Sequence, residues 1–185
     1  MNAREPKDYR LFHYTRQLVH LEDMLENGFW PRYCEEDFEW LVDKPSKIAF
    51  PMVCFCDIPI DAANMHRTRY GAFAIAFNKA WASMKDINPV WYIQSESSIR
   101  NHIRDSLTTT PRFNVKNNLN NPFLKLLAFI KPTIAFQPDR VIESVGGRGP
   151  VTEVFAADEE MEWRYTPTAL SDQWISHTSS GFVSE

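Results

Sequence analysis

The stretch near the amino terminus constrains the fold most, because a short strand pattern there runs directly into a helix pattern. Leu11–Thr15 predicts a β-strand whose successive side chains point to opposite faces, so that His13 and Thr15 share one face. Thr15 is also a good helix cap, because its hydroxyl can accept a hydrogen bond from a free backbone N–H. We therefore expect a strand that presents one histidine and one hydroxyl group beside the start of a helix.

The helix that follows is predicted to have one apolar face and a defined end. Four apolar residues recur at the spacing of one helical face: Leu18, Leu21, Met24 and Leu25. Asn27-Gly28 predicts the end, since glycine readily adopts the left-handed conformation that a C-terminal cap requires. This strand and helix form the unit around which we expect the remaining elements to pack.

Length and charge favour one domain that folds without a metal or a disulfide. The chain has 185 residues, which predicts a single domain over 1–185. Residues 1–10 and about 170–185 are expected to be loose, and 108–121 to form a surface loop. The net charge of −4 argues against broad electrostatic capture of nucleic acid. No apolar run approaches ~20 residues and no signal peptide is apparent, so we expect a cytoplasmic location and no membrane contact.

The three cysteines, Cys34, Cys54 and Cys56, are few and odd in number, which fits a reducing compartment. On a strand, Cys54 and Cys56 would face the same way, which is poor geometry for a disulfide. A zinc site would need a fourth ligand such as His66, and structural zinc usually draws on repeated close pairs of ligands. We therefore expect core cysteines and no metal site.

The remaining pattern mixes strands with helices. Ile48–Cys56 is apolar at both odd and even positions, as expected of a strand that is covered on both faces. Further strands are predicted at Ala72–Phe77, Val90–Ile93 and Thr133–Phe136. Helices are predicted at Lys79–Lys85 with Asn78 as its cap, at Ser98–Leu107, and at Phe123–Ile130 after Pro122. This order predicts an α+β fold.

Two charged segments have different predicted roles. Glu159–Tyr165 is expected to be a strand with Glu160, Glu162 and Arg164 on one face, where they would line a cleft or face water. An earlier acidic cluster is expected to be a solvated face: Glu35, Glu36, Asp37 and Glu39. The first segment is therefore the candidate for function.

Three strand-like settings offer the groups that a nucleotide glycoside would need. They are His13 with Thr15, Tyr70 beside Gly71, and Glu160 with Glu162. An imidazole can hydrogen-bond to ribose hydroxyls, and an aromatic ring can stack on a flat base. A carboxylate can stabilise the positive charge that develops as a glycosidic bond loosens.

Structural roles remain as alternatives for the same residues. His13 would then be a half-buried histidine bonded to a loop carbonyl, and Tyr70 a core residue. Glu162 and Arg164 share a predicted strand face, and either could form a structural ion pair with a neighbour.

Several of these motifs resemble the AbiGi family of bacterial abortive-infection proteins, which are described as antitoxins paired with AbiGii. The matching residues are His13-Tyr14-Thr15 with its helix and Asn27-Gly28-Phe29, the block from Pro51 to Pro59 (PMVCFCDIP), Tyr70-Gly71, Lys131-Pro132, and Glu160-x-Glu162-Trp163-Arg164-Tyr165. The resemblance extends from about Leu11 to Pro167. It implies a role in phage resistance and an AbiGii-like partner protein from a neighbouring gene.

More remotely, the His-Tyr-Thr start and the Glu-x-Glu strand resemble ADP-ribosyltransferases of the His-Tyr-Glu type. That resemblance implies a split, bent mixed sheet with flanking helices that grips NAD. It places His13, Tyr14 and Thr15 on the NAD site, with His13 as the ribose contact. It makes Tyr70 the ring that stacks on nicotinamide and Glu162 the catalytic carboxylate, while Glu160 would activate or orient the acceptor.

Three functional hypotheses follow from these residues and resemblances. The first is an enzyme that transfers ADP-ribose from NAD to a nucleic acid or a protein. The second is a non-catalytic antitoxin or sensor that binds a partner and keeps the NAD cleft as a relic. The third is a ribonuclease-like toxin that uses His13 and Glu162 as base and acid.

Overall fold

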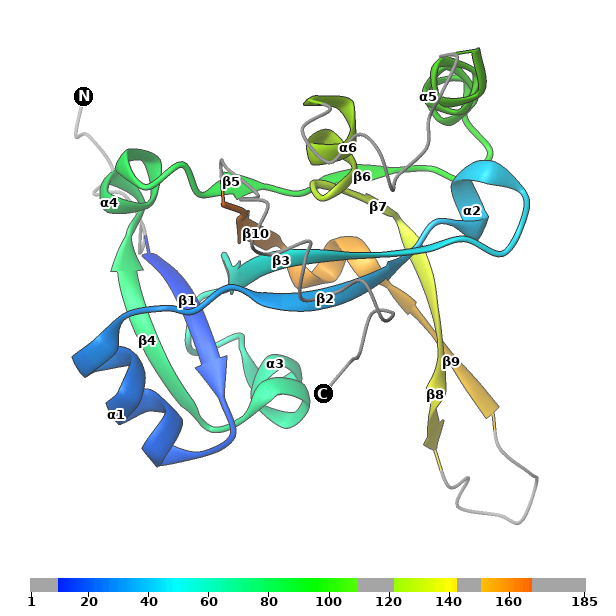
Figure 1. Cartoon of the computed structure of the whole chain (residues 1–185). Helices are drawn as coiled ribbons and strands as arrows, with labels where there is room; N and C mark the ends of the chain where they lie inside the picture. The colour runs from blue at the N-terminus through cyan, green and yellow to red at the C-terminus, as the bar shows by residue number, and fades with distance from the viewer. Residues whose placement is uncertain (1–9, 110–121, 143–150, 168–185) are drawn as a thin grey trace, which may run out of the picture.

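A computed structural model of the chain describes residues 10–109, 122–142 and 151–167 (Figure 1). The strands are β1 (Arg10–Thr15), β2 (Arg32–Asp37), β3 (Lys47–Cys56), β4 (Phe73–Asn78), β5 (Asn88–Pro89), β6 (Trp91–Ile93), β7 (Ile130–Pro132), β8 (Ile134–Ile142), β9 (Val151–Ala156) and β10 (Glu162–Tyr165). The helices are α1 (Leu18–Asn27), α2 (Glu39–Val42), α3 (Asn64–Tyr70), α4 (Lys79–Met84), α5 (Ser98–Thr109), α6 (Pro122–Leu127) and the 3₁₀ helix η2 (Ala157–Glu160). The predicted α+β class is confirmed.

The main sheet is antiparallel throughout and is arranged around β3. Its strand order is β4-β1-β3-β10-β5, and β2 pairs with β3 beside this path. A parallel pair, β6-β7, and an antiparallel pair, β8-β9, lie outside it. The prediction of a split, bent sheet of mixed pairing is therefore wrong in its pairing, because the main sheet has only antiparallel pairs. Parallel pairing needs a long crossover, and α5 and α6 lie in the connection between β6 and β7.

Strands β1 and β3 part soon after they meet, so the main sheet opens between them. They share one registered pair, Phe12 with Cys56, whereas β1 pairs with β4 along its whole length, from Arg10–Asn78 to Thr15–Phe73. Beyond Phe12, a side chain connects β1 to β3: Nδ1 of His13 donates a hydrogen bond to the Cys54 carbonyl at 2.7 Å.

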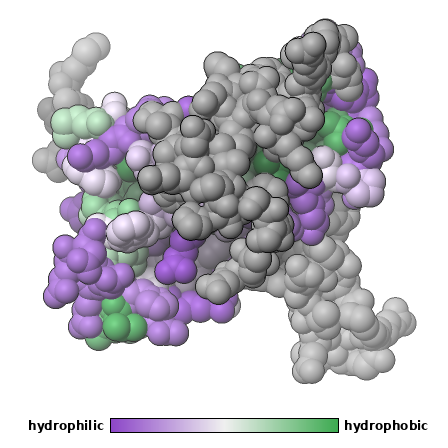
Figure 2. All heavy atoms as spheres, viewed as in Figure 1, coloured by the Kyte–Doolittle hydropathy of each residue, from purple (hydrophilic) through white to green (hydrophobic). Residues whose placement is uncertain are grey.

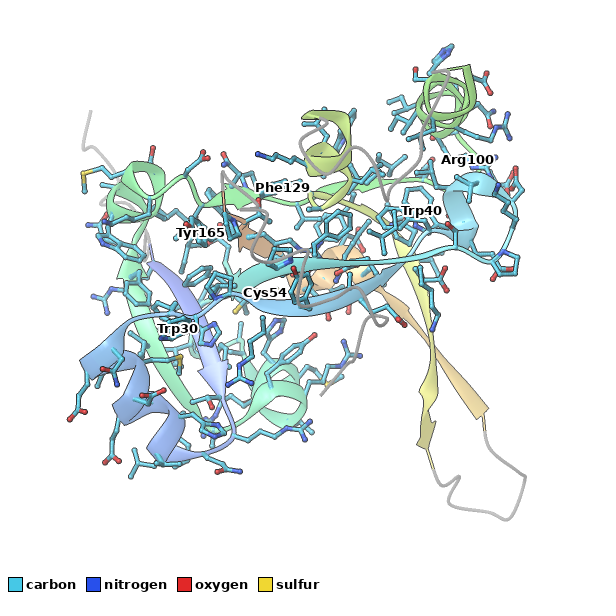
Figure 3. The ribbon with its side chains drawn as sticks, in the orientation of Figure 1. Trp30, Trp40, Cys54, Arg100, Phe129 and Tyr165 are labelled. Carbon is cyan, nitrogen blue, oxygen red and sulfur yellow. The ribbon has the colours of Figure 1, made fainter. Side chains whose placement is uncertain are left out.

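The two faces of β3 contribute side chains to two separate hydrophobic cores. Phe50 and Met52 pack in one cluster with side chains from α2, α5 and α6, including Leu41 and Leu127. The adjacent positions of opposite parity, Val53 and Phe55, pack in a second cluster with Leu11, Ala82 and Ile87. This confirms the prediction of a strand covered on both faces. Arg100 joins α5 to α2, since its Nε donates to the Trp40 carbonyl at 2.9 Å (Figure 3).

Helix α1 begins two residues later than predicted. Its N-cap is Gln17, which makes no side-chain capping bond, so the prediction that Thr15 caps this helix is wrong. Thr15 instead ends β1 opposite Phe73, where its backbone belongs to the strand ladder. The C-terminal cap at Gly28, with φ of 79°, is as predicted. The surface of α1 is mostly hydrophilic, as Figure 2 shows at its lower left.

Four other boundaries differ from the prediction. Glu159 and Glu160 belong to η2, and the left-handed Met161 (φ 43°) separates them from β10. Ile130 starts β7, although it was predicted to end a helix. Arg10 is in β1, and Thr108 and Thr109 belong to α5; the rest of the predicted loop 108–121 lies outside the described residues, as do 170–185. Within the described residues, no helix is long and apolar enough to cross a membrane.

Candidate functional site

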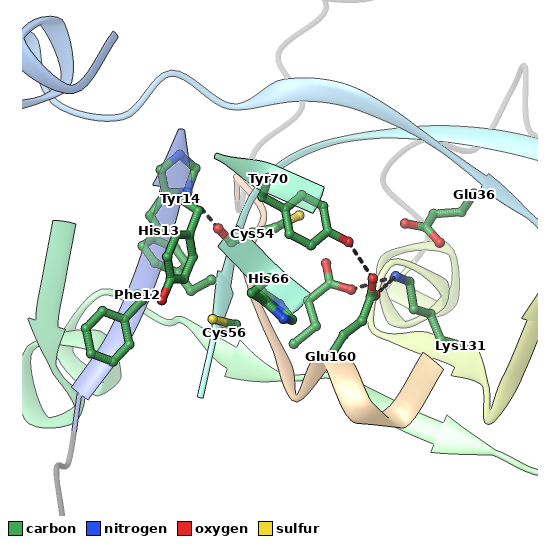
Figure 4. A pocket seen from close by; sticks show the side chains of 12 residues that line it. Phe12, His13, Tyr14, Glu36, Cys54, Cys56, His66, Tyr70, Lys131 and Glu160 are labelled. Carbon is green, nitrogen blue, oxygen red and sulfur yellow. Dashed lines mark hydrogen bonds and ion pairs between the residues drawn. The ribbon is translucent and has the colours of Figure 1, made fainter. Parts of the chain in front are cut away.

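A pocket of about 250 Å³ lies where β1 and β3 part (Figure 4). Its wall comes from β1, β2, β3, α3, β7, η2 and β10, which are far apart in the chain. The lining residues are Phe12, His13, Tyr14, Glu36, Cys54, Phe55, Cys56, His66, Tyr70, Lys131, Glu160 and Glu162. Aromatic rings and carboxylates therefore face the same cavity, which suits a flat ligand with a polar end.

His13 supplies a neutral imidazole on the β1 side. Its Nδ1 must carry the proton, because the Cys54 carbonyl at 2.7 Å can only accept, and this leaves Nε2 as an acceptor. Burial lowers the pKa of His13 and outweighs the opposing effect of this bond. The rings of Phe29 and Phe55 lie 5.0 and 5.7 Å from the imidazole and fix its orientation. The predicted carbonyl bond is thus present, although the carbonyl belongs to a strand.

An aromatic wall connects β1 to α3. The Tyr14 and His66 ring centroids are 6.0 Å apart, and those of His66 and Tyr70 are 5.1 Å apart. The Tyr70 hydroxyl donates to Glu160, and burial together with this carboxylate raises the pKa of Tyr70. The Tyr14 hydroxyl is buried and has no hydrogen-bond partner within the described part of the chain. These rings can hold a planar group between β1 and α3.

The opposite side of the pocket is a network of buried charges around Glu162. Arg164 binds both carboxylate oxygens of Glu162, with Nε 2.8 Å from Oε1 and Nη2 3.1 Å from Oε2. Lys131 Nζ lies 2.7 Å from the same Oε2. Burial alone would raise the pKa of Glu162, but attraction to Arg164 and Lys131 outweighs it and lowers this pKa to about 2. Glu162 is therefore ionised at neutral pH.

Two acidic residues have surroundings that the sequence patterns did not predict. Glu160 is only 4% exposed and binds Lys131 at 3.0 Å. It lines the pocket, as one of the two predicted alternatives, but it belongs to η2 and not to the strand. Glu36 is bound by Arg164 Nη2 at 2.6 Å, so it is not part of a solvated face. Glu35, its neighbour in β2, is solvated and pairs with Lys47 at the surface. Alternation along β2 sends Glu36 to the inner face.

Arg164 lies behind the pocket, where it joins Glu162 of β10 to Glu36 of β2. Its side chain is 0% exposed and binds Glu162, Glu36 and the Ala128 carbonyl. The expectation that Arg164 lines a cleft or faces water is wrong, because its partners offset the cost of burying its charge. Burial would lower the pKa of Arg164, but the two carboxylates raise it above its usual value.

Gly71 fixes α3 against β1 and so holds Tyr70 at the pocket. Its φ is +122°, and a Cβ atom there would lie 2.1 Å from the Thr15 carbonyl oxygen. Nearby, Arg16 Nη2 donates to the Arg69 carbonyl at 3.0 Å. Glycine is therefore required at this close approach of two backbones.

The structure brings five of the six predicted site residues to one pocket: His13, Tyr14, Tyr70, Glu160 and Glu162. The sixth, Thr15, does not line the pocket, because it is buried under Gly71 at the end of β1. The other seven lining residues were not predicted as site residues, and Glu36, His66 and Lys131 are the ones among them that carry a charged or imidazole group. Alternation in β2 could have indicated Glu36, and Lys131 belongs to the Lys131-Pro132 motif of the family resemblance, which assigned it no role.

Comparisons with known proteins identify similar chains. The family model AbiGi, described as "Putative abortive phage resistance protein AbiGi, antitoxin", matches residues 27–181. The abortive phage resistance protein AbiGi of Lactococcus lactis subsp. cremoris is 30% identical over 163 residues, which cover 79% of this chain and 64% of that protein. The chain therefore spans somewhat less than two thirds of the length of this relative. No solved structure matches the chain.

Proposed function

Because the chain belongs to the AbiGi family, we propose that it acts in abortive phage resistance through an NAD pocket. In this proposal the fold is related to that of ADP-ribosyltransferases, and the protein transfers ADP-ribose to a nucleic acid or a protein. The observation that carries the proposal is that His13 of β1 and Glu162 of β10 line the same pocket. Tyr70 and Glu160 line it with them.

The residues present fit the nicotinamide and ribose part of NAD. Tyr14, His66 and Tyr70 all line the pocket, so their rings offer aromatic surface on which a flat ring can stack. Nε2 of His13 is an acceptor for a ribose hydroxyl. Carboxylates on the opposite side favour the positively charged nicotinamide ring.

Each side chain then has a distinct role. When bound, NAD supplies ADP-ribose through its bond to nicotinamide. Glu162, ionised and rigidly held, stabilises positive charge on the ribose. Tyr70 stacks on the ring, and Glu160, to which its hydroxyl donates, orients the acceptor. His13 holds the ribose, and its bond to Cys54 fixes the imidazole for that task.

Substitution of Glu162 by glutamine tests this proposal. It removes the charge but keeps the size, so labelling of an acceptor by tagged NAD should fall by at least about 100-fold. Glu159→Gln is the matched control, because Glu159 lies three residues away and is exposed. The control should label like the unmodified protein. Equal labelling by the Glu162→Gln variant would rule out its assigned role, provided that both variants fold.

A second candidate is a non-catalytic antitoxin that binds a partner protein and keeps the NAD cleft as a relic. One observation favours it: both carboxylate oxygens of Glu162 are already engaged by Arg164 and Lys131. Ion pairing of this kind reduces the negative charge that a ligand would meet. The description of the matching family model also ends with the word antitoxin.

Expression of the unmodified chain and of its Glu162→Gln variant, each without a partner protein, separates the two candidates. A transferase should arrest bacterial growth, and Glu162→Gln should relieve the arrest. An antitoxin should be harmless alone and should form a stable complex with an AbiGii-like product of a neighbouring gene, without any need for NAD. The ribonuclease-like alternative is disfavoured, since a carboxyl group with a pKa of about 2 is a poor general acid at neutral pH.

A further inference from the structure

Lys131 lies where the carboxylates of the pocket converge. Its Nζ is 3.0 Å from Glu160 Oε2 and 2.7 Å from Glu162 Oε2, so one ammonium group bridges both side chains. Figure 4 shows Tyr70, Glu160 and Lys131 pointing toward one another, with Glu36 beyond Lys131. The Lys131 side chain is only 17% exposed, so this bridge is shielded from solvent.

Two other cations lie near the pocket, and neither is as close to Glu160 as Lys131 is. Arg164 binds Glu162, Glu36 and the Ala128 carbonyl. Arg69 Nη1 lies 3.9 Å from Glu160 Oε1, at the limit of an ion pair. Within the described residues, the ion pair of Glu160 with Lys131 is therefore shorter than its pair with Arg69.

We propose that Lys131 is a positioning residue, whose ammonium group holds the Glu160 and Glu162 carboxylates side by side and keeps Glu162 ionised. Its relevance to ADP-ribose transfer rests on the function proposed above. The structural part of the inference concerns the carboxylates themselves and can be tested in the protein without NAD.

The physical reason is repulsion between like charges in a buried place. Without the ammonium group, Glu162 and Glu36 would share the charge of Arg164, and no close cation among the described residues would lie between Glu162 and Glu160. The repulsion between these carboxylates would favour the uptake of a proton by Glu162. The charged and titratable groups around Lys131 are Glu36 of β2, His66 and Tyr70 of α3, Tyr92 of β6, Glu160 of η2, and Glu162 and Arg164 of β10. Burial would lower the pKa of Lys131, but the three glutamates raise it above its usual value.

Titration of the glutamate carboxyl groups by ¹³C NMR tests the inference. In Lys131→Met, the carboxyl signal assigned to Glu162 should titrate at least about one pH unit higher than in the unmodified protein. Lys131→Arg should restore most of the original titration. Lys47→Met is the control, because Lys47 pairs with Glu35 at the surface, and it should leave the Glu162 signal unchanged. If Lys131→Met does not fold, Lys131→Gln takes its place with the same expected shift.

Calorimetry with NAD on the same variants separates this inference from the proposed function. A carboxyl shift without any NAD binding to the unmodified protein would support the role of Lys131 and count against the NAD pocket. Tight NAD binding to the unmodified protein, with no carboxyl shift in Lys131→Met, would overturn the inference and leave the NAD pocket standing. An unrestored titration in a folded Lys131→Arg variant would also overturn it.

Discussion

Arg164→Met is expected to lower the free energy of unfolding by about 3–5 kcal/mol, the usual cost of removing one partner from a buried ion pair. Arg164 is fully buried, and its loss leaves Glu162 and Glu36 without their shared cation. It also leaves the Ala128 carbonyl without this donor. Chemical denaturation followed by circular dichroism measures the change.

The matched control for this prediction is Arg104→Met, since the ion pair of Arg104 with Asp43 lies near the surface and should contribute little to stability.

The dependence of stability on pH tests the same buried network. The pKa of Glu162 is lowered to about 2, so its pairing stabilises the fold above its ordinary pKa of 4.5 and is lost as the pH falls from there toward 2. That loss should be smaller in Arg164→Met. An unchanged stability at neutral pH would show that the buried network contributes little.

Gly71→Ala is expected to destabilise the fold by about 3 kcal/mol or more and to weaken the NAD binding proposed above. A φ of +122° is costly for any residue with a Cβ atom. The added atom would also meet backbone, with the Thr15 carbonyl oxygen at 2.1 Å, and backbone cannot move aside as a flexible side chain can. The end of α3 must then shift away from β1, and Tyr70 shifts with it.

Gly28→Ala is the control for that variant. Gly28 also has a positive φ of 79°, but among the described residues, its chain neighbours aside, no atom lies within 4 Å of an added Cβ. The substitution should therefore cost only about 1 kcal/mol and leave the proposed NAD binding intact. Denaturation and calorimetry on both variants distinguish backbone strain from the steric contact. Equal effects of the two substitutions would contradict the conclusion that the close approach of Gly71 to the Thr15 carbonyl holds α3 against β1.

Much of the fold could be predicted from local patterns. The apolar run Ile48–Cys56 indicated a strand covered on both faces, because such a run can be buried only between two cores. Asn78 caps α4 as expected, since its side chain accepts a hydrogen bond from the Ala80 backbone. Turns were harder to predict. The left-handed Met161 breaks the predicted strand before Glu162, and nothing in the pattern signals that conformation in a non-glycine residue.

The site was predicted in part, because residue type and strand position indicated His13 and Glu162. Tyr70 was predicted in a strand-like setting, which is wrong, because Tyr70 ends helix α3. Glu160 was placed on the wrong element but lies in the expected cavity, since η2 directs it there. The charge network could not be predicted. Arg164 meets Glu36 across 128 residues of sequence, and such pairings depend on the tertiary fold.

A crystal structure of the protein soaked with NAD tests the central claim most directly. We expect nicotinamide density against Tyr70, with the ribose between the His13 imidazole and the Glu162 carboxylate. Binding of NAD elsewhere on the protein, or an empty pocket at millimolar NAD, would contradict the claim that these two side chains form one nucleotide site.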